Sequence, residues 1–453
     1  MNDYRTLTTE PIPVLIRRIA VPASIGYFFN TMFNVVDTVF GGLISTRALA
    51  ALSLSLPVFF IILAMGVGIS TGTTALIANA LGAGERREAK LIAIQGITFG
   101  VLLSIVITYS GCLASPFLFS LLGASGPYLD DSLIYMNTIF AGAIFFMLAY
   151  MLNAILYALG DTRSFRNFLT AGFFMNIALD PFFIYGGFGL PPLGILGIAL
   201  ATVLIQAGGC LYLGVKVYQT RLISNKDVRD IFPKARPFIE IARQGFPASI
   251  NMMTVGLGIF VITYFVSRFG KEAVAAYGIA TRIEQIILLP SIGLNVATLT
   301  IVAQNNGAGR FDRITETLNR SLLYGGLLMA AGTLIVFAGA APLMGLFTGD
   351  GGVIGIGKVF LRIDSLVFFA YVILFVNVAA LQGVKRPFYA IWLGLSRQVV
   401  APVLVFYTTT VLLGFGLLGI WWGIFAITWT AALVTLFYSG ALLKRVEKES
   451  TAL

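Results

Sequence analysis

The sequence predicts an all-α integral membrane protein in which twelve transmembrane helices form two pseudo-symmetric six-helix lobes. Of its 453 residues, 58% are hydrophobic and only 11% are charged, and the mean hydropathy is +0.91. A soluble globular protein has roughly 45–50% apolar and about 25% charged residues. Because this apolar excess is too large for a buried core alone, most of the chain is expected to lie in lipid.

Twelve apolar runs are long enough to cross a bilayer as helices, which takes about 20 residues. They span residues 14–43, 48–80, 90–119, 128–157, 165–188, 194–218, 238–268, 273–305, 315–347, 354–381, 388–413 and 416–443. The longest polar connection lies between the sixth and seventh runs. It predicts a first lobe at 1–218, a cytoplasmic linker at 219–237 and a second lobe at 238–453.

Four short motifs recur in the same order in the two halves. The tetrapeptide PASI begins at Pro22 and again at Pro247, and the tripeptide GAG begins at Gly82 and again at Gly307. Both pairs are 225 residues apart, while LGDTRSF with QGVKRPF and LGILGIA with FGLLGIW are 223 and 222 residues apart. The halves therefore read as parallel repeats about an axis along the membrane normal, an arrangement that secondary transporters use.

Basic residues indicate the side of the membrane on which each loop lies. The loops on the same side as the N-terminus carry most of the Lys and Arg residues, including Arg86, Arg87, Lys385 and Arg386. By the positive-inside rule, both termini are expected in the cytoplasm and the protein in the cytoplasmic (inner) membrane. This distribution accounts for the net charge of +10 without a nucleic-acid partner.

Histidine is absent from the sequence. This excludes a Ser-His-Asp triad and most zinc sites, and the absence of a Walker motif argues against ATP as an energy source. A proton carrier that works near neutral pH would have to be a carboxyl group in an unusual environment. The sequence therefore favours a transporter over an enzyme, and no cofactor is expected.

Two aspartates, Asp37 and Asp180, lie inside apolar spans of the first half. An ionisable group there costs about 2.5–3.5 kcal/mol on insertion scales and usually faces a cavity or a partner. The equivalent positions of the second half are Ile262 and Ala401, so the repeat has lost both acids there. Each aspartate comes late in a span that starts inside, so the two are expected at comparable depth, where one would keep a proton.

Amide side chains accompany both acids. Asn30, Asn34 and Asp37 follow at i, i+4 and i+7, which places them on one stripe of a helix. Asn176 lies one turn before Asp180. The set predicts a proton-coupling site, with Asn30 and Asn34 lining the substrate cavity. Carboxylate and amide oxygens also suit Na⁺, which leaves a sodium site open as an alternative.

Pro22 lies 15 residues before Asp37, roughly 22 Å along a helix. A proline removes the hydrogen bond to the carbonyl four residues back, here Arg18, and so permits a bend. We expect the first span to bend near Pro22 when Asp37 is protonated. Pro247 holds the equivalent place without an acid after it, so PASI alone does not predict coupling.

These features together resemble the multidrug and toxic compound extrusion (MATE) transporters. The resemblance rests on the two lobes, the PASI and GAG motifs and the segments FNVVDTVFGG and NIALDPFFIYG, and it covers essentially the whole chain. The position of Pro22 and Asp37 in the first span, with Asp180 in the fifth, resembles the DinF-like branch.

The resemblance implies a secondary antiporter that exports amphipathic drugs and toxic organic cations against proton influx by alternating access. It also implies that Tyr135, Asn153 and Thr202 line the cavity of the first lobe. Apart from lipid, nothing in the sequence requires a partner, so a monomer is expected. The alternatives are Na⁺ coupling at Asp37, Asn176 and Asp180, a flippase for lipid-linked precursors, and an intramembrane protease with paired aspartates.

Four further charged residues lie in or near spans of the second half: Arg282, Glu284, Asp364 and Arg397. Arg282 and Glu284 are two residues apart, so they do not share a helix face. We expect these residues to form ion pairs between the lobes or at the membrane interface. The alternative is that Asp364 binds a cation, as acids of the second lobe do in another branch of the resembling family.

Overall fold

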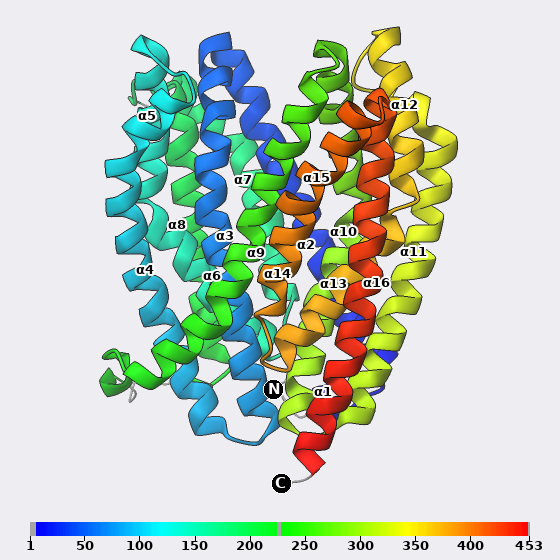
Figure 1. Cartoon of the computed structure of the whole chain (residues 1–453). Helices are drawn as coiled ribbons and strands as arrows, with labels where there is room; N and C mark the ends of the chain where they lie inside the picture. The colour runs from blue at the N-terminus through cyan, green and yellow to red at the C-terminus, as the bar shows by residue number, and fades with distance from the viewer. Residues whose placement is uncertain (1–5, 188, 224–227, 452–453) are drawn as a thin grey trace. The chain divides into compact units, whose positions relative to one another are not determined.

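The computed structural model describes residues 6–187, 189–223 and 228–451, which are nearly all helical (Figure 1). Residues 224–227 of the predicted linker lie outside this part. Within it, ten helices are long and apolar enough to cross a membrane, and two bent pairs raise the number to twelve if each pair is one span. The predicted fold class is confirmed.

The first half of the chain contains eight helices among the described residues. They are α1 (Thr6–Thr9), α2 (Ile12–Ile44), α3 (Thr46–Gly82), α4 (Arg86–Leu121), α5 (Gly126–Ala141), α6 (Ala143–Ala158), α7 (Arg163–Tyr185) and α8 (Ile195–Gln219).

The second half begins with a short 3₁₀ turn in the connection and continues with the remaining helices. They are η1 (Val228–Ile231), α9 (Ala235–Ser267), α10 (Lys271–Gly307), α11 (Phe311–Gly345), α12 (Gly351–Ser365), α13 (Phe368–Gly383), α14 (Tyr389–Leu395), the π-helical η2 (Ser396–Val400), α15 (Ala401–Tyr407), the π-helical η3 (Thr408–Leu412) and α16 (Gly416–Thr451).

Two predicted spans, 128–157 and 354–381, are bent pairs of helices in the structure. The helices α5 and α6 meet at 44°, and α12 and α13 meet at 49°. At the bends, the N–H of Phe145 donates to the carbonyl of Gly142 at 3.0 Å and that of Val367 to the carbonyl of Asp364 at 2.8 Å. Hydrogen bonds to the third residue back tighten the turn, which lets the helix axis change direction. An apolar run carries no sign of such a turn.

The chain forms two compact units, whose boundaries fall inside helices. Among the described residues, unit 1 contains Ile25–Ser249 and unit 2 contains residues 6–24 and 250–451. The unit therefore changes after the serine of each PASI motif, within α2 and within α9. These boundaries differ from the lobe boundaries at 218 and 238 that the sequence repeat predicts, because the first turns of each PASI helix pack in the unit opposite to the rest of that helix.

A close helix contact in each unit explains why PASI occurs twice. In unit 1, a Cβ atom on Gly68 of α3 would overlap the backbone and side chain of Ser249. In unit 2, a Cβ atom on Gly293 of α10 would overlap the side chain of Ser24 and the carbonyl of Ala20. The two glycines, like the two serines, are 225 residues apart. The repeated motif thus marks one close contact that each unit makes for itself.

The repeated GAG loops end α3 and α10 in the same way. Gly84 and Gly309 have φ angles of +77° and +67°, in the left-handed region that favours glycine. The N–H of Glu85 donates to the carbonyl of Ala80 at 2.8 Å, and the N–H of Arg310 makes the matching bond in α10 at 2.9 Å. The motif therefore forms a helix C-cap, which satisfies carbonyls left free at the helix end.

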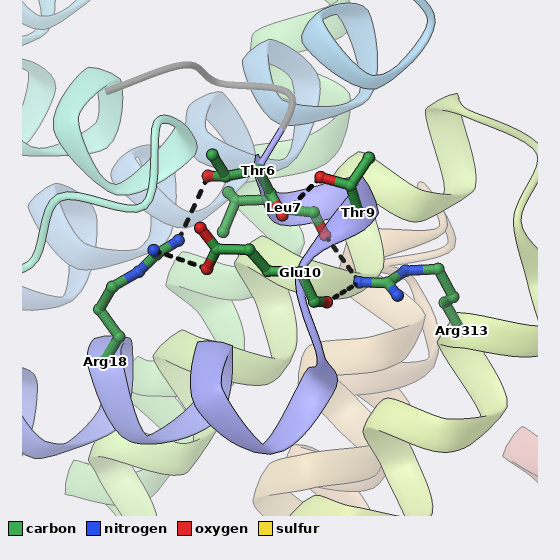
Figure 2. A network of polar contacts seen from close by, with 6 residues as sticks. All are labelled: Thr6, Leu7, Thr9, Glu10, Arg18 and Arg313. Atoms are coloured by element: carbon green, nitrogen blue, oxygen red, sulfur yellow. Dashed lines mark hydrogen bonds and ion pairs between the residues drawn. The ribbon is translucent and has the colours of Figure 1, made fainter. Parts of the chain in front are cut away.

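In unit 2 a chain segment before the PASI helix, the N-terminal strap Thr6–Glu10, is tied to α11 (Figure 2). Arg313 donates from Nη2 to the carbonyl of Glu10 at 2.6 Å and to that of Leu7 at 3.4 Å. Arg18 forms an ion pair with the Glu10 carboxylate at 2.7 Å. Leu7 is buried beneath these bonds.

Unit 1 ties the segment before its own PASI helix in a similar manner. Gln95 of α4 donates from Nε2 to the carbonyls of Asp230 and Phe232 and accepts from the N–H of Lys234 at 2.8 Å. Both segments lie at equivalent positions of the repeat, so each unit anchors the start of one PASI helix through side chains of its third or corresponding long helix.

Candidate ion-coupling site

Two buried acids of unit 1 come from helices far apart in the sequence. Asp37 lies in α2 and is 9% exposed, and Asp180 lies in α7 and is fully buried. Both helices are apolar enough to span a membrane, so each carboxyl group lies well inside the hydrophobic part of the chain. An acid in that environment needs a polar partner or a proton.

Asn176 connects the two helices at this point. Its Nδ2 donates to Oδ1 of Asp37 at 2.9 Å, and its side chain is fully buried. Asp180 follows one turn later on α7 and is an electrostatic neighbour of Asp37. The structure therefore brings the three predicted coupling residues together.

Several oxygens of this cluster have no hydrogen-bond partner among the described residues. They are both carboxyl oxygens of Asp180 and Oδ1 of Asn176. The phenol of Tyr135, from α5, is an electrostatic neighbour of both Asp37 and Asp180 and is 7% exposed. Buried polar atoms are normally paired, so an unpaired group of oxygens is suited to hold a proton or a small cation.

Three predicted cavity residues do not join this cluster through a hydrogen bond. Asn30 and Asn34 are exposed, and Asn34 donates to the carbonyl of Asn30 at 2.9 Å within its own helix. Thr202 is buried and donates to the carbonyl of Ile198 at 3.0 Å within α8.

Asn153 belongs to a second polar cluster of unit 1. Its side chain and that of Tyr157 are polar neighbours on α6, and Tyr157 in turn faces Tyr27 of α2. Tyr150, one face of α6 away, is an electrostatic neighbour of Tyr27. The sequence reasoning missed the three tyrosines. The signal that could have found them is the spacing of Tyr150, Asn153 and Tyr157 at i, i+3 and i+7, which puts them on one helical stripe.

A family model described as MatE matches residues 22–182 and 247–408. The chain belongs to the MatE family. The two matched stretches begin at Pro22 and Pro247, so the match follows the internal repeat. MatE proteins are membrane transporters, which confirms the predicted family and the expectation that the protein is not an enzyme.

Known proteins resemble this MatE chain over almost its full length. The probable multidrug resistance protein NorM of Thermotoga maritima is 29% identical, with 97% of this chain and 96% of that protein covered. The FAD transporter of Shewanella oneidensis is 27% identical, with 88% of each covered. The crystal structure of MATE in complex with MaL6 matches with a TM-score of 0.92 at 24% identity, covering 99% of this chain and 100% of that one.

Proposed function

We propose that this MatE protein is a secondary active antiporter that exports amphipathic, cationic compounds and takes up protons in exchange. The observation that carries the proposal is the buried contact of Asp37 with Asn176, next to an Asp180 whose oxygens are unpaired. We place it as a monomer in the cytoplasmic membrane with both termini in the cytoplasm. The multidrug name of its Thermotoga relative agrees with this substrate class.

Exchange follows from competition for one negative charge. When Asp37 is ionised, it attracts a cationic substrate into unit 1 and accepts the hydrogen bond from Asn176. When a proton arrives from outside, this charge disappears, and the attraction for the substrate disappears with it. Two carboxyl groups at close range share a proton more readily than either binds one alone, so Asp180 assists the uptake.

The proposed bend of α2 at Pro22 would transmit this change. Pro22 lies two residues before the point at which α2 passes from unit 2 to unit 1. The helix lacks one backbone bond there, and Ser24 donates from Oγ to the carbonyl of Ala20 at 2.9 Å, a bond that often accompanies helix bending. A hinge at this place would move the part of α2 that carries Asp37 relative to the anchored first turns.

Coupling to Na⁺ is the second candidate, and one observation favours it. The unpaired oxygens of Asp180 and Asn176, together with the Asp37 carboxyl group, are hard ligands of the kind that alkali and alkaline-earth cations take. In this alternative the same residues bind the cation, and the exchange with substrate has the same logic.

An anionic cargo is disfavoured by the charge of the cluster. The Shewanella relative is named an FAD transporter, and FAD carries phosphate groups. The residues that face one another in unit 1 are acids, an amide and phenols. A phosphate-bearing molecule, including a lipid-linked precursor, would require basic side chains at this place.

Proteoliposomes that contain a fluorescent organic cation separate the two coupling modes. We expect efflux under a pH gradient without sodium, little efflux under a sodium gradient alone, and loss of the first by Asp37→Asn. Asp312→Asn, at an exposed position of α11, serves as the matched control that should keep full activity. Efflux driven only by sodium would select the second candidate, and full activity of Asp37→Asn under both gradients would contradict both.

A further inference from the structure

Unit 2 contains a cluster of charged residues that the coupling site does not use. Glu284 of α10, Asp364 of α12 and Arg397 of η2 are electrostatic neighbours of one another. Asp364 is only 2% exposed, and neither of its oxygens has a hydrogen-bond partner among the described residues. The expected ion pairing thus concentrates within unit 2, whereas Arg282 is exposed and takes no part.

Two tyrosines border this cluster. The Tyr371 ring lies under the guanidinium of Arg397, with 4.8 Å between Cζ and the ring centroid, and its phenol is a neighbour of Glu284. Tyr277 faces both acids and packs edge-on against Phe360, at 5.5 Å between ring centroids. The cation is therefore held by an aromatic face on one side and carboxyl groups on the other.

The local backbone directs Arg397 into this position. It lies in the π-helical turn η2, between α14 and α15. A π turn widens the helix by one residue and is frequent at functional sites. A guanidinium is weakly hydrated and stacks on aromatic rings, so it tolerates a poorly solvated place better than an ammonium group does.

Charge balance gives the cluster its consequence. Two buried carboxyl groups without a cation would need protons or an external ion, because isolated buried charge is very costly. Arg397 supplies one positive charge from within the chain. In unit 1, by contrast, the interacting partners of Asp37 are Asn176 and Asp180, which supply none.

We propose that Arg397 is a tethered counter-cation for Glu284 and Asp364, and that it closes this acidic pair to external cations. Ion coupling is thereby restricted to unit 1, a part of the inference that rests on the proposed function. Arg397 is then a specificity-determining residue, since it decides which of two acidic clusters is open to a free ion.

The test measures the melting temperature of purified protein in detergent, with choline chloride replaced by NaCl at constant ionic strength. All variants carry Asp37→Asn and Asp180→Asn, which removes the unit 1 site. We expect no sodium effect with Arg397 present. Arg397→Ala should melt lower in choline and gain about 3 °C or more in sodium. Methylguanidinium, which fits the vacated place, should stabilise Arg397→Ala more than sodium does.

Two further variants exclude a general effect of salt. Arg397→Lys keeps the positive charge and should stay insensitive to sodium. Arg397→Ala combined with Asp364→Asn removes the charge that needs a partner, so the sodium gain should disappear. If Arg397→Ala gains nothing from either cation, or if its gain survives Asp364→Asn, the proposal is wrong.

One arm remains decisive even if Arg397→Ala does not fold. The protein that retains Arg397 must show no stabilisation by sodium in the background without Asp37 and Asp180. A sodium-dependent rise that Asp364→Asn removes would mean that the pair binds external cations despite Arg397, and would overturn the inference. None of these readouts requires transport, so failure of the proposed antiport would be seen separately.

Discussion

The two units share one scaffold and differ in how they balance buried acid. Unit 1 holds Asp37 and Asp180 with Asn176, and unit 2 holds Glu284 and Asp364 with a cation of its own. The acids are also at different places of the repeat, because Ile262 stands at the position equivalent to Asp37.

This difference shows which features an internal duplication retains here. The contacts that shape the backbone occur in both units: the glycine–serine contact at PASI and the capped turn at GAG. The buried charges do not repeat. Packing contacts determine whether either unit folds, whereas a buried acid with a free valence serves a function that one unit can supply alone.

Removal of the unit 1 acids should have the largest effect. Asp37→Asn and Asp180→Asn should each reduce gradient-driven efflux to the level of empty liposomes, because the exchangeable charge is lost. Asp364→Asn should leave most of the efflux, since Arg397 already balances that pair. Equal losses for Asp37→Asn and Asp364→Asn, at equal amounts of folded protein, would remove the functional contrast between the units.

The two PASI prolines provide a second comparison. Pro22→Ala restores a backbone donor where α2 is proposed to bend and should lower the efflux rate several-fold without loss of folded protein. Pro247→Ala makes the same change in α9, which has Ile262 in place of the acid, and should have a smaller effect. Initial rates measured under one pH gradient decide this, and a larger loss for Pro247→Ala would refute the assignment of the hinge.

The close contacts should respond equally in both units. Gly68→Ala and Gly293→Ala each place a methyl group against backbone atoms, and overpacking of this kind costs about 1–3 kcal/mol of folding free energy. Gly278→Ala, in α10 with no atom within 4 Å of its Cβ position, is the matched control and should not destabilise. Thermal unfolding in detergent compares them, and an unchanged melting temperature for both close-contact variants would contradict the packing account.

The smallest effect is expected at the tied segments. Arg313→Met in unit 2 and Gln95→Met in unit 1 each leave backbone carbonyls without their donors. Because water can replace these bonds near the membrane surface, each change should cost only about 1 kcal/mol. Limited proteolysis of the strap and of the linker reports the change, and the cleavage rate should rise in the segment of the altered unit only.

Much of the candidate site could be predicted from the sequence. A lone acid in an apolar run is a strong signal, because burial of such a group is costly, and so Asp37, Asp180 and Asn176 were identified together. The tyrosines around Asn153 gave a weaker signal, since aromatic residues are common in any membrane helix. The bends in the fourth and tenth spans gave none, because they depend on which backbone hydrogen bonds form at Gly142 and Val367.

The sequence by itself determined that the chain crosses a membrane in twelve spans, that it is a duplicated transporter, and that its first half carries the isolated acids. These properties follow from hydropathy and repetition, which act locally along the chain. Only the tertiary structure decided which side chains meet. It joined Asn176 to Asp37 across 139 residues, placed Arg397 beside Asp364, and assigned the first turns of each PASI helix to the opposite unit, because these outcomes depend on contacts between distant segments.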